Sequence, residues 1–338
     1  MAAARSPARS EPRRLPDWLV PVAIALLLAA LPFIVSPYQQ DLVVKVLIYA
    51  VFALSLELLV GTTGLVSLGH AAFLGIGAYV TALASASGES PSLVRVLPFA
   101  VLAAAAYALF VGALSLRTKG IYFIMVTLAF AQMAFFVFHD TKLAGGSDGL
   151  YLSAKPVLGT LFDLDRRVHF YYFVLGALVF TYALLAMLLR SRFGHALAGI
   201  RVNEPRMRAV GFQTYPYKLA AFVIAGALAG LAGFLLAVKD GVVNPDLLSW
   251  HESGGVLLML ILGGLGHLRG AVIGAVAFTL LKELYSSHGL VGPLADHWQL
   301  TFGVTIIAFV ALLPKGLIGL GDRLRRQPVA ASRSEDDD

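Results

Sequence analysis

Apolar residues along this chain fall mostly into blocks of about 18 to 22 residues, with polar segments between them. Since an α-helix rises about 1.5 Å per residue, such a block crosses roughly 30 Å of hydrocarbon. The pattern predicts an all-α polytopic membrane protein with about ten transmembrane helices. The predicted blocks are Trp18–Val35, Leu42–Val60, Leu65–Ala86, Leu93–Leu116, Ile121–Phe138, Phe170–Leu189, Leu219–Val238, Gly254–Leu265, Ala271–Leu284 and Leu300–Leu313.

Two of these blocks need interpretation. The block at Gly254–Leu265 is short and rich in glycine, which predicts a broken or re-entrant helix in place of a full span. The block at Trp18–Val35 follows a basic, proline-rich stretch and could be part of a signal peptide. It is longer than a typical signal-peptide core, and no small-residue cleavage site follows it, so we expect a retained span.

Composition supports a membrane protein, because 58% of the 338 residues are hydrophobic and only 14% are charged. The net charge of +6 is therefore read as basic cytoplasmic loops and not as a nucleic-acid surface. The chain has no cysteine, which excludes disulfides, thiolate nucleophiles and cysteine-based metal sites.

The distribution of basic residues predicts the orientation. If the N-terminus is inside, 18 of the 26 Lys and Arg residues lie on the inner side and 8 on the outer side. Because cytoplasmic loops carry the excess of Lys and Arg, both termini are expected in the cytoplasm. We expect residues 1–16 to form a disordered cytoplasmic N-terminus, 17–320 the transmembrane domain and 321–338 a cytoplasmic tail. Within the domain, 139–169 is an outer loop and 190–217 an inner one.

The chain lacks the usual nucleotide-binding and zinc-protease motifs. Glycine is never followed by lysine, so there is no Walker A phosphate loop, and no His-Glu-x-x-His occurs. We therefore expect no catalytic residue, metal site or cofactor, and any ATP hydrolysis must belong to a partner.

The inner loop carries signals for a short helix. Asn203 suits an N-cap, Glu204 and Pro205 suit a first helical turn, and Gly211 suits a stop. Such a helix, lying along the membrane, can fit a groove on another protein. The alternative is an ordinary basic loop beside the membrane.

Polar residues inside apolar blocks are the other candidates for function. Glu57 can neutralise a substrate ammonium group, pair with a base of a neighbouring subunit, or lie close to the inner interface. His70 is favoured as a hydrogen-bonding residue of the interior over a proton relay. Glycines at four-residue spacing, such as Gly266 and Gly270, suit either a substrate path or close packing of helices.

Three motifs together resemble one family. The stretch Leu65–Tyr79 is similar to SLGHAAFxGIGAY, residues 145–150 to GGSDGL, and Arg201–Gly211 to RxNExRAxxxG. These are signatures of LivM-type permeases of the branched-chain amino-acid ABC transporters. With further matches, the resemblance covers about residues 45 to 320.

The resemblance implies a permease subunit in a bacterial inner membrane, surrounded by lipid, with no nucleic acid bound. It implies a second, LivH-type permease, two cytoplasmic ATPase subunits, a periplasmic substrate-binding protein and an amino-acid substrate. The residues that would couple to an ATPase are Arg201, Asn203, Glu204, Arg206, Ala209 and Gly211. The residues expected in the translocation pathway or in helix packing are Glu57, Ser67, Gly69, His70, Gly75, Gly263, Gly264 and Gly266.

Two residues depart from the family pattern. Glu57 stands where a polar residue, often Asn, is expected, and Pro205 directly follows the coupling-loop glutamate. An acidic lining group would favour cationic or amide substrates, so a urea or short-chain amide permease is the alternative. An ion-coupled secondary transporter is a further rival, which the long basic inner loop disfavours.

Overall fold

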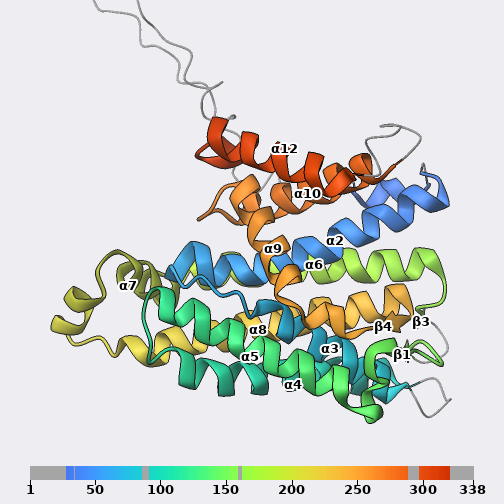
Figure 1. Cartoon of the computed structure of the whole chain (residues 1–338), viewed down its shortest axis with the longest axis horizontal. Coiled ribbons are helices and arrows are strands. Elements are labelled where there is room, and N and C mark those ends of the chain that lie inside the picture. The colour runs from blue at the N-terminus through green and yellow to red at the C-terminus, as the bar shows by residue number, and fades with distance from the viewer. Residues whose placement is uncertain (1–27, 34, 86–90, 159–161, 288–296, 320–338) are drawn as a thin grey trace, which may run out of the picture.

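The computed structural model describes residues 28–33, 35–85, 91–158, 162–287 and 297–319. These residues are almost entirely helical (Figure 1). The helices are α2 (Pro37–Glu57), continued by the π-helical segment η2 (Leu58–Thr63), then α3 (His70–Ala84), α4 (Leu93–Ser115), α5 (Ile121–Asp140), α6 (Arg167–Arg190), α7 (Arg192–Ala209), α8 (Thr214–Asp240), α9 (Trp250–Gly263), α10 (Leu268–Ser286) and α12 (Trp298–Leu312).

Short elements connect these helices. Strands β1 (Leu150–Tyr151) and β4 (Val242–Val243) pair antiparallel, as do β2 (Val157–Leu158) and β3 (Phe162–Asp163). Single 3-10 turns are η1 (Leu31–Phe33), η3 (Lys142–Ala144), η4 (Gly146–Asp148) and η5 (Pro245–Leu248).

Every predicted block from Leu42 onward coincides with a helix, whereas Trp18–Val35 lies mostly outside the described residues. The number of full spans is lower than expected. In the described part of the chain, five helices are long and apolar enough to cross a membrane by themselves: α2 with η2, α4, α5, α6 and α8.

The remaining apolar helices are short or bent. The pair α9 and α10 turns by 114° at its break and counts as one further broken span or a re-entrant loop. Helices α3 and α12 have 15 residues each, which gives about 22 Å of helix against roughly 30 Å of hydrocarbon. Blocks that looked alike by hydropathy therefore differ in whether they cross the bilayer alone.

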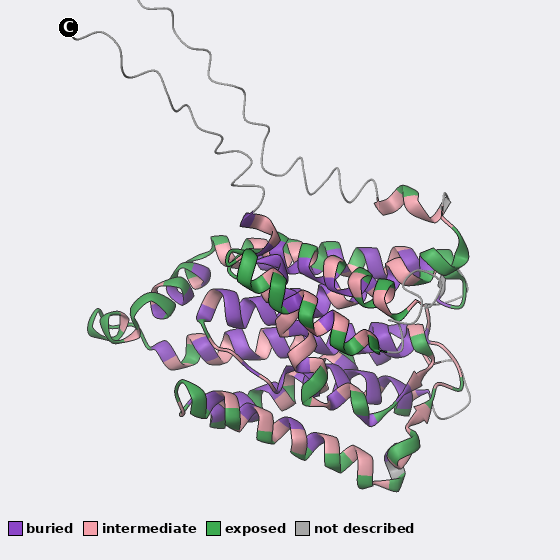
Figure 2. Ribbon diagram, turned by 45° about the horizontal axis from the view of Figure 1, so that its top comes forward, coloured by how far each residue is buried: buried purple, intermediate pink, exposed green. Residues whose placement is uncertain are grey.

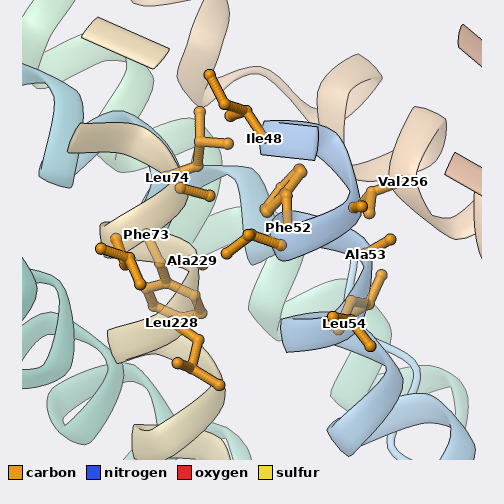
Figure 3. Close-up of a cluster of buried hydrophobic side chains, with 14 of the residues drawn as sticks. Ile48, Phe52, Ala53, Leu54, Phe73, Leu74, Leu228, Ala229 and Val256 are labelled. Atoms are coloured by element: carbon orange, nitrogen blue, oxygen red, sulfur yellow. The ribbon is translucent and has the colours of Figure 1, made fainter. Parts of the chain in front are cut away.

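Helices α2 and α8 form the centre of the molecule. In each of them, 83% of the most apolar stretch of 18 residues is buried, against 22% in α5 and 28% in α6. Figure 2 shows the same contrast between purple inner helices and greener outer ones. Ile48 and Phe52 of α2, Leu74 of α3 and Ala229 of α8 meet in the core (Figure 3).

Small residues bring α3, α4 and α8 close together. A side chain added at Gly77 of α3 would collide with the Gly230 carbonyl of α8, and one at Gly233 would collide with the Leu74 carbonyl. Gly226 contacts Ala108 of α4 in the same way. Because lipid tails are as apolar as leucine, such close packing is what holds helices together in a membrane.

The two ends of the helices carry different structures. Helix α7 protrudes at one end, and β1, β3 and β4 lie at the other (Figure 1). Since β1 follows α5 and β4 follows α8, the pairing of β1 with β4 ties the loop at 139–169 to the connection between α8 and α9. The two long loops thus lie at opposite ends, as alternation along the chain predicts.

The packing of α3 on α8 yields a first prediction. We expect Gly77→Val to lower the free energy of unfolding by about 1–3 kcal/mol, because the valine has no room beside Gly230. The control is Gly176→Val on α6, where an added side chain meets nothing within 4 Å. Thermal unfolding of the purified variants in detergent is the measurement, and equal midpoints for the two would contradict the packing account.

Candidate coupling helix and the junction at the end of helix α2

Helix α7 is two helices joined at Asn203. The backbone of Asn203 is non-helical, with φ −156° and ψ 93°, and its Oδ1 accepts a hydrogen bond of 3.0 Å from the N–H of Arg206. Asn203 is therefore the N-cap of a short second helix. This helix ends at Ala209, and Gly211 follows with φ +94°, so the predicted start and stop are both confirmed.

The break at Asn203 explains how α7 accommodates Pro205. Counted from the N-cap, Pro205 is the second residue of the new helix, where its missing N–H needs no partner inside the helix. A proline that departs from the family pattern therefore fits this position without disturbing the helix.

The side chain of Glu204 points back to the loop and to the start of α8. Its Oε1 accepts hydrogen bonds from Nη2 of Arg208 at 2.5 Å, from Nζ of Lys218 at 2.9 Å and from Oγ1 of Thr214 at 2.8 Å. Lys218 and Thr214 are buried residues at the start of α8. The carboxylate thus fastens the short helix to the first turn of α8.

These partners set the pKa of Glu204. Partial burial opposes the charged form, but the hydrogen bonds from Lys218, Thr214 and Arg208 and the charge of Lys218 lower the pKa from 4.5 to about 2. Because the folded pKa is depressed, the interaction stabilises the loop above pH 4.5 and is lost as the pH falls toward 2.

The outer face of the loop is partly apolar. Val202 is 86% exposed and Val210 is 73% exposed, and Arg206 and Ala209 beside them are also exposed. Together with the short helix between them, the two valines offer apolar surface that a groove on another protein can cover. Sequence analysis missed both valines, because hydropathy alone does not show which way a side chain points.

Glu57, at the end of α2, lies far from this loop in sequence but close in space. Its Oε1 accepts a hydrogen bond of 2.7 Å from the N–H of Gly266, in the turn between α9 and α10, and the N–H of His267 lies nearby. Arg201 of α7 donates through Nη1 to the carbonyl of Gly61, one turn after Glu57. We call this set of contacts the α2 junction.

His70 lies in the interior at the first residue of α3. Its Nε2 is 2.8 Å from Oγ of Ser55, and its ring stacks on Phe52 and meets Phe73 edge-on. The next N–H, of Ala71, donates to Oγ of Ser253 at 2.9 Å. These contacts fix the start of α3 between α2 and α9, in agreement with the hydrogen-bonding role expected for His70.

The neighbouring candidates in and just before α3 also make close contacts. Oγ of Ser67 accepts from the N–H of Gly69 at 3.2 Å, and Gly69 lies against the backbone of Thr127 in α5. Gly75 lies against Leu248 of η5. A role of these residues in the substrate path stays a prediction.

Glycines form the turn between α9 and α10. Gly263 lies against the carbonyl of Gly270 and the N–H of Gly274, which lets the two helices meet at their break. Gly264, with φ +112°, lies against the carbonyl of Lys315. The structure therefore gathers Gly263, Gly264 and Gly266 into one turn, which touches the α2 junction on one side and Lys315 on the other.

Comparisons with known proteins show the family of the chain. A family model described as "Branched-chain amino acid transport system / permease component" matches residues 39–310. The chain belongs to this family. It is thus a multi-pass transport permease subunit, not a catalytic subunit. No solved structure matches the chain.

Two kinds of relative within the family are similar to the chain. The permease protein LivM of Escherichia coli (strain K12) is 31% identical over 88% of this chain and 74% of its own length. A probable LivM of Methanocaldococcus jannaschii is 23% identical over 67% of this chain and 69% of its own length. The permease protein LivH of Escherichia coli (strain K12) is 23% identical over 80% of this chain and 91% of its own length.

The contacts of Glu204 yield a second prediction. We expect Glu204→Gln to speed amide hydrogen exchange in residues 203–213, because a neutral amide accepts weaker hydrogen bonds from Lys218 and Arg208. Arg206→Gln, in the same helix but on its exposed face, is the control. Equal protection of the two variants would rule out the fastening role.

The pKa of Glu204 yields a third prediction, on pH. The difference in loop protection between the wild type and Glu204→Gln should be constant above pH 4.5 and should shrink as the pH falls toward 2. Hydrogen exchange corrected for its intrinsic pH dependence measures this difference. A difference that is already lost near neutral pH would contradict an ionised Glu204.

Proposed function

We propose that this chain is the LivM-type permease of an ATP-driven importer of branched-chain amino acids in a bacterial inner membrane. A LivH-type permease, two cytoplasmic ATPase subunits and a periplasmic binding protein would complete the complex. The family match supports this assignment, and the higher identity to LivM than to LivH favours the LivM position.

The observation that carries the mechanism is the short helix that follows Asn203. It stands at the end of the molecule, is flanked by the exposed Val202 and Val210, and is fastened through Glu204 to Lys218 of α8. A groove on an ATPase subunit would cover the valines. Because α8 is the central helix, movement of the docked loop would reach α2, α3 and α4 directly.

The orientation follows from the same arrangement. The loop at 190–217 is proposed as cytoplasmic, with both termini on that side, because it carries the excess of basic residues. The loop at 139–169, at the opposite end, then faces the periplasm, where a binding protein would deliver the substrate.

The contacts of Glu57 bear on the substrate. The acidic residue raised the alternative of a cationic or amide substrate, on the assumption that its carboxylate lines the pathway. One carboxylate oxygen is instead bonded to Gly266, and the residue is only 2% exposed. This removes the reason to prefer a cation and favours branched-chain amino acids, as the names of the relatives suggest.

The experiment is reconstitution of the chain in proteoliposomes with its proposed partners. Leucine-loaded binding protein should stimulate both ATP hydrolysis and leucine uptake. Stimulation by urea or short amides alone would establish the alternative substrate class, and failure of any ATPase to co-purify would contradict the importer.

Docking yields a fourth prediction. We expect Val210→Glu to remove the ATPase subunits from the purified complex, because a charge replaces an apolar contact. Tyr151→Glu is the matched control, since Tyr151 is also an exposed apolar residue, at the other end of the molecule. ATPase retention is measured by co-purification, and loss in both variants or in neither would contradict docking at this loop.

A further inference from the structure

The proposed function leaves the acidic side chain of Glu57 unexplained. Acidic residues in membrane helices are rare and usually serve a function. Glu57 is 2% exposed and lies near the end of the apolar span formed by α2 and η2. A neutral amide side chain would accept the same hydrogen bond from Gly266, so this hydrogen bond alone does not require a carboxylate.

The first partner of Glu57 is the corner of the broken helix pair. Gly266 lies between α9 and α10, where the chain turns by 114°, and its φ is +88°. Its N–H donates to Glu57 Oε1 at 2.7 Å, with the N–H of His267 nearby. A single carboxylate of α2 therefore holds the point about which α9 and α10 bend.

The backbone around Glu57 is shaped to hold this carboxylate. The side chain lies against Gly61, one turn further on, where an added side chain would collide with the carboxylate. Residues Leu58–Thr63 form a π-helix, a widened turn that is common at functional sites. It ends at Gly64, whose φ is +73°.

The second partner is Arg201, which belongs to the coupling loop. Its guanidinium donates to the carbonyl of Gly61 and interacts electrostatically with Glu57. Its side chain also lies beside Gly64 and Gly266. Arg201, two residues before the break at Asn203, therefore contacts both the π-helical end of α2 and the α9–α10 turn.

We propose that Glu57 and Arg201 are positioning residues that make the α9–α10 turn move with the coupling loop. The proposal rests on the proposed function, because it needs an ATPase to move that loop. The guanidinium carries the displacement of α7 to the end of α2, and the carboxylate carries it on to Gly266. A carboxyl group suits this position because it accepts from the N–H of Gly266 and interacts electrostatically with Arg201.

This connection differs from the one through Glu204. Glu204 fastens the loop to α8, whereas Arg201 fastens the same loop to α2 and to the broken pair. The turn is held on its far side by backbone contacts of Gly264 with Lys315 and Gly316. Because Gly264 is held in place, a displacement at Gly266 would change the angle between α9 and α10.

The first test measures coupling in the reconstituted importer, per assembled complex. We expect Glu57→Leu to raise the number of ATP molecules hydrolysed per leucine transported by roughly 2- to 30-fold. Glu57→Gln keeps the acceptor for Gly266 and loses only the charge, so its effect should be smaller but in the same direction. The control is Thr279→Val, which removes a buried hydroxyl group from α10, away from Glu57. This variant should leave the ratio unchanged.

The outcomes separate the two proposals. If the wild-type chain assembles with no ATPase, the proposed function fails. If the wild type couples normally and both Glu57 variants keep its ratio of ATP to leucine, or merely accumulate less, the positioning role is wrong.

A second test follows the movement itself. The chain has no cysteine, so spin labels can be placed at Ala198 of α7 with Tyr151, or at Leu265 with Tyr151, all of which are exposed. In the assembled wild type, a non-hydrolysable ATP analogue should change both distances. In both Glu57 variants the Ala198 distance should still change. The Leu265 distance should not change with Glu57→Leu and should change less than in the wild type with Glu57→Gln. A Leu265 distance that responds in both variants as in the wild type would overturn the proposal.

Discussion

The structure depends on one constraint, which is that hydrocarbon offers no hydrogen bonds to the chain. Helices satisfy most of the backbone, and small residues such as Gly77 and Gly230 let the inner helices pack closely enough to stay together. Where a helix breaks or begins inside the bundle, a backbone N–H that has no partner in its own helix needs one from another helix. The N–H of Gly266 finds that partner in Glu57, and the N–H of Ala71 finds it in Ser253.

The loop at 190–217 is connected to the core at two points. Outside the bilayer, the loop needs charged contacts to hold its shape, and Glu204 supplies them through Lys218 at the start of α8. At the boundary, Arg201 reaches the carbonyl of Gly61. The loop is therefore connected both to α8 and to the end of α2.

Sequence analysis predicted features that depend on neighbouring residues. The apolar blocks appeared as helices with similar bounds, and Asn203 caps the helix that its neighbours suggested. Features that depend on distant residues were beyond it. Glu57 and Gly266 are 209 positions apart, and no local pattern shows that they meet. The glycine-rich block at Gly254–Leu265 did predict the break between α9 and α10, but hydropathy does not show that α3 begins only at His70.

The central claim is that the loop after Asn203 meets an ATPase and that the opposite end meets the binding protein. Photo-crosslinking tests it most directly, with a photoreactive amino acid at Val210 or at Tyr151 in membranes that contain the whole complex. The account predicts that the probe at Val210 is captured by an ATPase subunit and the probe at Tyr151 is not. Capture of the ATPase from Tyr151, or of the periplasmic binding protein from Val210, would contradict it.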